Sequence, residues 1–240
     1  MKLDPTFKPR SVLCVAAHPD DLEFSVAGSV ACWCSEGAEV NYLICTNGAN
    51  GSTDRTLSQQ KLVETRQNEQ RMAAKILGVK EVVFFDYEDG SVEVTMKLKK
   101  DITREIRRFN PDVVFCMDPT LLYIPDRWFI NHPDHRAVGQ ATVDAVYPMA
   151  RDHLMFPELL DLGYEPHKVR TLLLSNFEKS NFAIDITSEF PTKIKALAAH
   201  ESQIPDLLAT EQMLKAWAKD AGKLVGVKYA EAFVRVDLPG

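Results

Sequence analysis

Two short segments of the chain combine histidine, proline and aspartate in nearly the same order. They read AHPDDLE over residues 17–23 and NHPDH over residues 131–135. Imidazole and carboxylate groups are ligands that zinc favours, and a catalytic zinc site needs three of them and one open position. His18, Asp21 and His135 can supply two imidazoles and a carboxylate. The sequence therefore predicts a hydrolytic metal site built from both segments.

Each segment also carries titratable groups that the metal would not need. Asp20 lies beside the ligand Asp21, and we expect it to act as a general base that takes a proton from water. His132 lies three residues before His135, and Asp134 between them could hold the His132 ring and favour its protonated form. Asp20, His132 and Asp134 are therefore the predicted catalytic residues.

Helix capping is the structural alternative for both segments. Proline suits the first turn of a helix, and the positive end of the helix dipole stabilises a nearby aspartate. Capping explains the proline and aspartate residues, but it requires no histidine at positions 18, 132 and 135. The metal interpretation accounts for all of these residues at once.

The elements that must position these groups alternate along the chain. Short apolar runs predict strands over 12–16, 40–45, 82–85 and 113–116, and amphipathic segments predict helices over 20–36, 59–77, 97–109 and 136–150. Such alternation predicts an α/β fold with a mostly parallel sheet between two helical layers. A smaller C-terminal α/β extension would follow, with strands over 169–174, 182–186 and 229–237 and helices over 188–201 and 206–222. Both histidine segments follow strands at the carboxyl edge of the sheet, where ligands bind in open parallel sheets.

Length and composition limit the classes of protein that the chain can belong to. A chain of 240 residues with 45% hydrophobic and 26% charged residues fits a single globular domain over residues 1–240. A net charge of −6 disfavours nucleic-acid and anionic-membrane partners. No apolar stretch reaches the roughly 18 residues of a membrane span, and the start lacks a secretory pattern. Cysteines within apolar runs indicate free thiols in a reducing compartment, so we expect a cytoplasmic protein.

The two motifs together resemble the paired signature of the PIG-L/LmbE-like deacetylases. RQNE at 66–69 followed by AKILG at 74–78 is similar to the helix between that family's motifs, and AHESQ at 199–203 looks like its late histidine segment. The resemblance covers about residues 11–203. It implies a Rossmann-like fold and the zinc-dependent removal of N-acetyl groups from glucosamine-containing molecules.

The resemblance also assigns roles position by position. His18, Asp21 and His135 would be the zinc ligands, Asp20 the base, and His132 with Asp134 the pair that stabilises the oxyanion. Whether Asp20 or His132 protonates the leaving amine stays open. A small amino-sugar substrate and a homo-oligomeric state are further implications of the resemblance.

Residues that would contact the substrate are less sharply defined. The proline-containing loop over 118–130 resembles the branch of the family that includes diacetylchitobiose deacetylases, and its Tyr123 and Trp128 either stack on a sugar face or pack the loop onto the domain. Arg66 contacts the substrate or is a solvated arginine in a salt bridge. His200 either approaches an active site, which could lie across a subunit boundary, or is a core or interface histidine.

Three other functions make different demands on the residues of the two motifs. A nucleotide-binding protein would carry Gly-x-Gly-x-x-Gly at the first strand-to-helix turn, where this chain has carboxylates that repel phosphate. A non-catalytic, metal-stabilised binding protein would leave Asp20 and His132 unexplained. A metal-dependent amidase acting on another small acylated substrate, such as a thiol precursor or an antibiotic intermediate, stays open.

Overall fold

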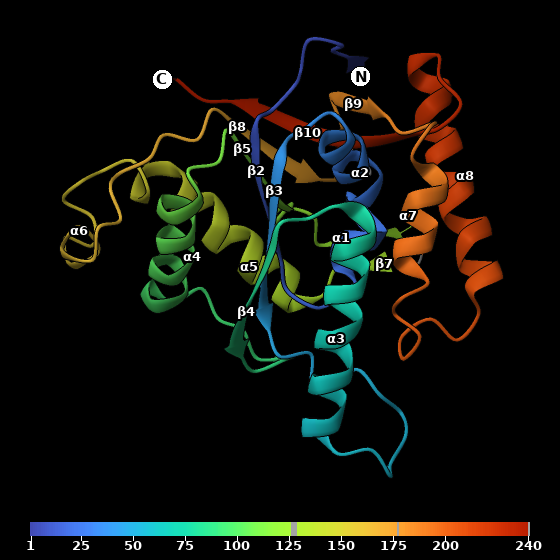
Figure 1. Cartoon of the computed structure of the whole chain (residues 1–240), viewed down its shortest axis with the longest axis horizontal. Coiled ribbons are helices and arrows are strands. Elements are labelled where there is room, and N and C mark those ends of the chain that lie inside the picture. Colours follow the sequence, from blue (N-terminus) through green and yellow to red (C-terminus); the bar gives the residue numbers. More distant parts are fainter. Residues whose placement is uncertain (126–128, 177, 240) are drawn as a thin grey trace.

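The fold is built around one eight-stranded sheet with helices on both faces (Figure 1). The computed structural model describes residues 1–125, 129–176 and 178–239. The strands lie in the order β1-β9-β10-β8-β5-β2-β3-β4. Their bounds are β1 (Lys2–Leu3), β2 (Ser11–Ala16), β3 (Glu39–Thr46), β4 (Glu81–Tyr87), β5 (Val113–Met117), β8 (Thr171–Ser175), β9 (Phe182–Asp185) and β10 (Ala230–Asp237). The helices are α1 (Asp21–Ser25), α2 (Ala27–Ser35), α3 (Gln59–Leu77), α4 (Met96–Phe109), α5 (Pro133–Asp144), α6 (Glu158–Asp161), α7 (Phe190–Leu197) and α8 (Leu207–Val225).

The sheet is mostly parallel, which confirms the predicted α/β class. Strands β8, β5, β2, β3 and β4 pair in parallel, whereas β10 runs antiparallel to both β8 and β9. The predicted C-terminal extension is therefore continuous with the parallel sheet, because β10 joins it through β8. No helix of the described ranges is both long enough and apolar enough to cross a bilayer.

Strand β2 shows why the chain forms layers. Its side chains alternate between two cores: Val12 and Cys14 pack with α2, α3 and α7, and Leu13 and Val15 pack with α4 and α5. All four of these side chains are fully buried. A strand buried on both faces needs the continuous apolar run from which the sequence predicted it.

Two predicted helices differ from the observed ones. The helix expected over 20–36 is divided at Val26, whose backbone leaves the helical region at φ −135° and separates α1 from α2. The helix expected over 136–150 begins earlier, at Pro133, and α5 ends at Asp144 before a π turn (η2, Ala145–Met149). Within that turn Tyr147 has an extended backbone, because the proline that follows disfavours helical geometry at the preceding residue.

A short hairpin lies beside the carboxyl edge of the sheet and was not predicted. Strands β6 (Tyr123–Ile124) and β7 (Phe129–Ile130) pair antiparallel. The chain then enters α5, which approaches β5 closely at Gly139, where a Cβ atom would collide with the carbonyl oxygen of Met117. The second histidine segment is thereby held at the end of β5.

Candidate metal and catalytic site

The first histidine segment forms a tight turn at the end of β2. The His18 N–H donates to Asp21 Oδ2 at 2.8 Å. Asp20 adopts a left-handed backbone with φ 91°, which is uncommon for a residue with a side chain. Its N–H donates to Gln70 Oε1 at 2.9 Å, and Arg66 Nη2 donates to the Pro19 carbonyl at 2.8 Å. Two side chains of α3 therefore hold the strained turn in place.

The second segment brings His135 to the same point from the first turns of α5. The potential ligand atoms of His18, Asp21 and His135 all lie within 4.8 Å of one another. His135 Nε2 is 3.0 Å from Asp21 Oδ1 and 3.3 Å from His18 Nδ1. Two imidazole nitrogens and a carboxylate oxygen that converge in this way fit a zinc ion. The structure thus brings together the three predicted ligands.

Outer partners fix the orientation of both imidazoles. His135 Nδ1 lies 3.1 Å from Asn131 Oδ1, and Asn131 Nδ2 donates to the Leu121 carbonyl at 2.8 Å. His18 Nε2 lies 3.1 Å from a carboxylate oxygen of Asp134 and 3.1 Å from one of Asp89. Each ring therefore points its other nitrogen toward the cluster, which is the usual arrangement around metal-binding histidines.

The charges around His18 favour a cation. Burial alone would lower the pKa of His18, but hydrogen bonds to Asp134, Asp21 and Asp89 raise it to about 12. The imidazolium of His18 and two backbone N–H groups lower the pKa of the Asp134 carboxyl in return, although burial opposes this shift. Carboxylates thus outnumber the fixed positive groups around the cluster. A metal ion would supply the missing positive charge.

Asp20 has the protonation behaviour expected of a general base. Burial and the charge of Asp21 raise the pKa of Asp20 to about 7, and the guanidinium of Arg66 partly opposes this rise. Arg66 Nη2 lies 3.5 Å from Asp20 Oδ2. A carboxylate with a pKa near neutrality combines adequate basicity with a substantial ionised fraction.

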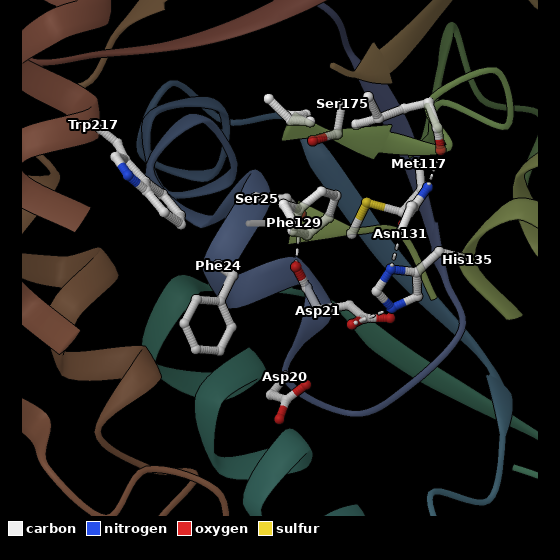
Figure 2. A pocket seen from close by; sticks show the side chains of 12 residues that line it. Asp20, Asp21, Phe24, Ser25, Met117, Phe129, Asn131, His135, Ser175 and Trp217 are labelled. Atoms are coloured by element: carbon white, nitrogen blue, oxygen red, sulfur yellow. Dashed lines mark hydrogen bonds and ion pairs between the residues drawn. The ribbon is translucent and has the colours of Figure 1, made fainter. Parts of the chain in front are cut away.

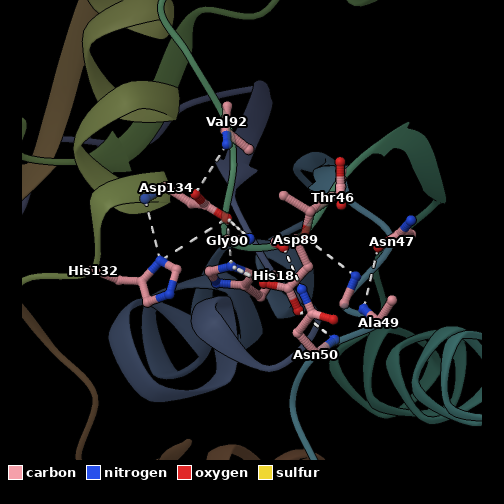
Figure 3. A network of polar contacts seen from close by, with 12 residues as sticks. His18, Thr46, Asn47, Ala49, Asn50, Asp89, Gly90, Val92, His132 and Asp134 are labelled. Atoms are coloured by element: carbon pink, nitrogen blue, oxygen red, sulfur yellow. Dashed lines mark hydrogen bonds and ion pairs between the residues drawn. The ribbon is translucent and has the colours of Figure 1, made fainter. Parts of the chain in front are cut away.

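Asp134 and His132 lie close together, but other donors hold the Asp134 carboxylate at shorter distances (Figure 3). The Asp134 carboxylate accepts from Gly90 N at 2.7 Å and Val92 N at 3.2 Å and contacts His18, whereas it lies 4.0 Å from His132 Nδ1. The His132 ring instead accepts from the Asp134 backbone N–H at 3.2 Å. Burial and the charge of His18 lower the pKa of His132, and the charge of Asp134 partly opposes this shift. The carboxylate turns inward because three donors satisfy its oxygens there.

A cavity of about 330 Å³ adjoins the cluster (Figure 2). Asp20, Asp21 and His135 form part of its wall. Most of the remaining wall is apolar and consists of Phe24, Met117, Leu121, Ile124, Phe129 and Trp217. Its size is at the lower end of the range of about 300–1,000 Å³ that is typical of small-ligand pockets.

Three of the predicted substrate-binding residues, Arg66, Tyr123 and His200, are not part of the wall of this cavity. Arg66 is buried on α3 and bonds to backbone carbonyls and Asp20, so it positions the turn. Tyr123 is exposed on β6 and is not part of the wall. His200 is fully buried against Glu23, with 3.1 Å between Nε2 and Oε2, and matches the alternative of a core histidine. Trp128 lies outside the described residues.

Sequence reasoning missed the residues that hold the site together. Asp89 and Gln70 belong to neither histidine segment, and Asn131 stands in the sequence only as a neighbour of His132. Asp89 follows strand β4 at the same edge of the sheet as His18, so the rule that located His18 could have found it. No comparable signal marks Gln70, whose partners lie 47 and 50 residues away in the sequence.

The fold and the cluster together define an α/β protein with a His/Asp group able to hold a metal at the carboxyl edge of a parallel sheet. The model of the PIG-L family (GlcNAc-PI de-N-acetylase) matches residues 13–146. The chain belongs to this family.

Individual relatives are similar over most of the chain. It is 32% identical over 230 residues to a diacetylchitobiose deacetylase of Thermococcus kodakarensis, covering 95% of this chain and 84% of that protein. It is 26% identical to a probable N-acetyl-alpha-D-glucosaminyl L-malate deacetylase of Bacillus anthracis, covering 81% of each chain. The solved N,N'-diacetylchitobiose deacetylase from Pyrococcus horikoshii superposes with a TM-score of 0.88 at 32% identity, covering 97% of this chain and 86% of that one.

Proposed function

We propose that the protein is a zinc-dependent N-deacetylase that acts on an N-acetylglucosamine-type amino sugar or its conjugate. The observation that carries this proposal is the convergence of His18, Asp21 and His135 beside a small cavity whose wall includes Asp20. Two relatives and one solved structure, each at least a quarter identical to this chain, act by their names on such sugars. Both lines of support indicate hydrolysis of an acetamide.

The reaction divides among the residues according to their surroundings. A bound zinc ion would supply a Lewis acid for the amide carbonyl. Asp20, with a pKa of about 7, takes the proton from the attacking water. His132 is half-exposed beside His18, with 4.7 Å between ring centroids, and stabilises the charge that develops on the carbonyl oxygen. Asp20 or His132 then returns a proton to the leaving amine.

The biological setting is a separate proposal. We propose that residues 1–240 form one domain that works in the cytoplasm as a homo-oligomer, with a small amino sugar and neither nucleic acid nor membrane as partner. All five cysteines are free thiols, which is consistent with a reducing compartment. Light scattering of the purified protein tests the oligomeric state directly.

The decisive experiment measures acetate release from N-acetylglucosamine and N,N'-diacetylchitobiose by metal-stripped protein, before and after zinc is added. Release that depends on zinc supports both the reaction and the metal. Stoichiometric zinc binding without release would favour the second candidate, an amidase acting on a different small acylated substrate. Absence of both would contradict the proposal.

A further inference from the structure

The cavity beside the cluster has the wrong lining for a sugar. Besides the charged cluster and the indole N–H of Trp217, the polar lining residues in the part of the chain that the structure describes are Ser25, Asn131 and Ser175. The Ser25 hydroxyl donates to the Asp21 carbonyl at 2.7 Å, and both ends of the Asn131 amide are engaged by His135 and Leu121. A sugar ring placed here would bury several hydroxyls with few partners. Each hydroxyl buried without a hydrogen-bond partner would weaken binding.

The scissile amide has two substituents, and only one of them can enter this cavity. The reacting carbon must lie within reach of Asp20 and of a metal held by Asp21 and His135, all of which are part of the wall. One substituent of the amide, the acyl group, is apolar. The other, the amino sugar, is polar. Figure 2 shows the side chains that would surround the acyl group: Phe24 and Trp217 lie on one side of Asp21, and Met117 and Phe129 lie beyond it.

His132 lies outside the wall of this cavity and is partly open to solvent. Its ring lies against His18, with 4.7 Å between ring centroids, and its side chain is 42% exposed. The hydroxyls of a sugar can stay in contact with water on this open side of the cluster, whereas most of the cavity wall can contact only hydrocarbon. An N-acylated sugar has one substituent suited to each of these two surroundings.

The cavity is also much larger than an acetyl group requires. A methyl group is similar in size to one water molecule, whose share of liquid volume is about 30 Å³. The cavity measures about 330 Å³. An acetyl group would leave most of this apolar volume without contacts.

From this mismatch we propose that the cavity is an acyl-chain subsite, and that the enzyme hydrolyses N-acylated amino sugars with chains of four to eight carbons in preference to acetyl. The inference rests on the proposed N-deacylation but changes its substrate class. The reaction balances as ordinary hydrolysis: the amide C–N bond breaks, water adds its oxygen to the carbonyl carbon, and the amine leaves with a proton as the fatty acid forms.

The test compares N-acetyl-, N-butyryl-, N-hexanoyl- and N-octanoylglucosamine on the zinc-loaded protein, with glucosamine release as the readout. Burial of each added methylene should raise kcat/KM by up to about fourfold until the cavity is full. A kcat/KM that falls from acetyl to butyryl would overturn the inference while leaving the proposed deacetylation intact.

A binding measurement separates failure of this inference from failure of the proposed function. Calorimetry on zinc-loaded Asp20→Asn protein compares the Kd of N-hexanoylglucosamine with that of N-acetylglucosamine. Tighter binding of the hexanoyl compound supports the subsite even if no sugar is turned over, in which case the proposed reaction is what fails. Equal or weaker binding contradicts the subsite.

A pair of matched substitutions locates the effect in the cavity. Ile124→Phe enlarges a side chain of the wall, whereas Ile130→Phe makes the same change on the neighbouring strand at a residue that is 80% exposed. The hexanoyl-to-acetyl ratio of kcat/KM should fall in the first variant and stay unchanged in the second. An equal effect in both would refute the assignment, and the chain-length series on unmodified protein decides if Ile124→Phe does not fold.

Discussion

Replacing His200 with alanine should destabilise the protein and leave substrate binding unchanged. The His200 and Glu23 side chains are both fully buried and lie 3.1 Å apart, and Glu23 also accepts from Gln70 Nε2 at 3.0 Å. Removing one partner of such a pair costs about 3–5 kcal/mol, because the other charge stays buried. His200 Nδ1 has no hydrogen-bond partner among the described residues. We therefore expect a loss near the lower end, about 3 kcal/mol.

The loss should depend on pH in a defined direction. Burial alone would lower the pKa of His200, but the hydrogen bond and charge of Glu23 outweigh it and raise the pKa above its ordinary value. A folded-state pKa above the unfolded value of about 6.5 means that the stabilisation is fully present below that pH. It is then lost as the pH rises through the folded-state pKa. The stability difference between wild type and His200→Ala should therefore shrink toward alkaline pH.

Urea unfolding at about pH 6 and about pH 9, followed by circular dichroism, measures both effects. His153→Ala is the matched control, because His153 is an exposed histidine. A loss below about 1 kcal/mol, the range of an exposed pair, would refute the buried-pair reasoning. An altered KM with unchanged stability would instead support the other alternative from the sequence, in which His200 approaches an active site and contacts the substrate.

Four further substitutions test the roles in the candidate site. His135→Ala removes a proposed ligand and should weaken zinc binding by more than about 100-fold in a chelator competition; an unchanged metal content would place His135 outside the site. Asp20→Asn should keep stoichiometric zinc but lower kcat by about 100–10,000-fold, and zinc loss would show that Asp20 is a ligand. Asp89→Asn removes a charge that holds His18, so zinc affinity measured by titration should fall about 10–100-fold. Gln70→Met removes the bond that holds the left-handed Asp20 backbone, so kcat should fall about tenfold with KM and zinc content unchanged, and a parallel loss of zinc would contradict this positioning role.

Most of the fold was predictable because its elements carry local signals. Helix α3 was predicted with its observed bounds: Ser58 caps its start and Gly78 ends it with φ 84°. The strands of the parallel sheet were predicted from apolar runs, which are buried in β2, β3 and β5 and only partly buried in the edge strand β4. The division of the first helix at Val26 had no such signal, because valine neither caps nor breaks a helix. The two-residue strands β6 and β7 are too short to show an alternating pattern.

The candidate site was predictable only where its chemistry appears in the sequence. His18, Asp21 and His135 stand in two conspicuous motifs, and the topology rule places both motifs at one edge of the sheet. Asp89 stands in an ordinary turn sequence, Glu88-Asp89-Gly90, that by itself indicates only a change of direction. Its contact with His18 exists because β4 and β2 end at the same edge, and sequence spacing does not show it.

Asp134 shows why neighbours in sequence reveal only part of such a site. It is two residues from His132, and that proximity suggested a pair. A buried carboxylate, however, is held by whichever donors satisfy its oxygens most fully. Gly90 and Val92 from the loop after β4, together with His18 from the loop after β2, satisfy Asp134 better than the half-exposed ring of His132 can. One carboxylate therefore joins the chain segments that follow three strands, so the orientation of His18 depends on all three loops. A change in the loop after β4 should alter metal affinity even though none of the three proposed ligands lies in that loop.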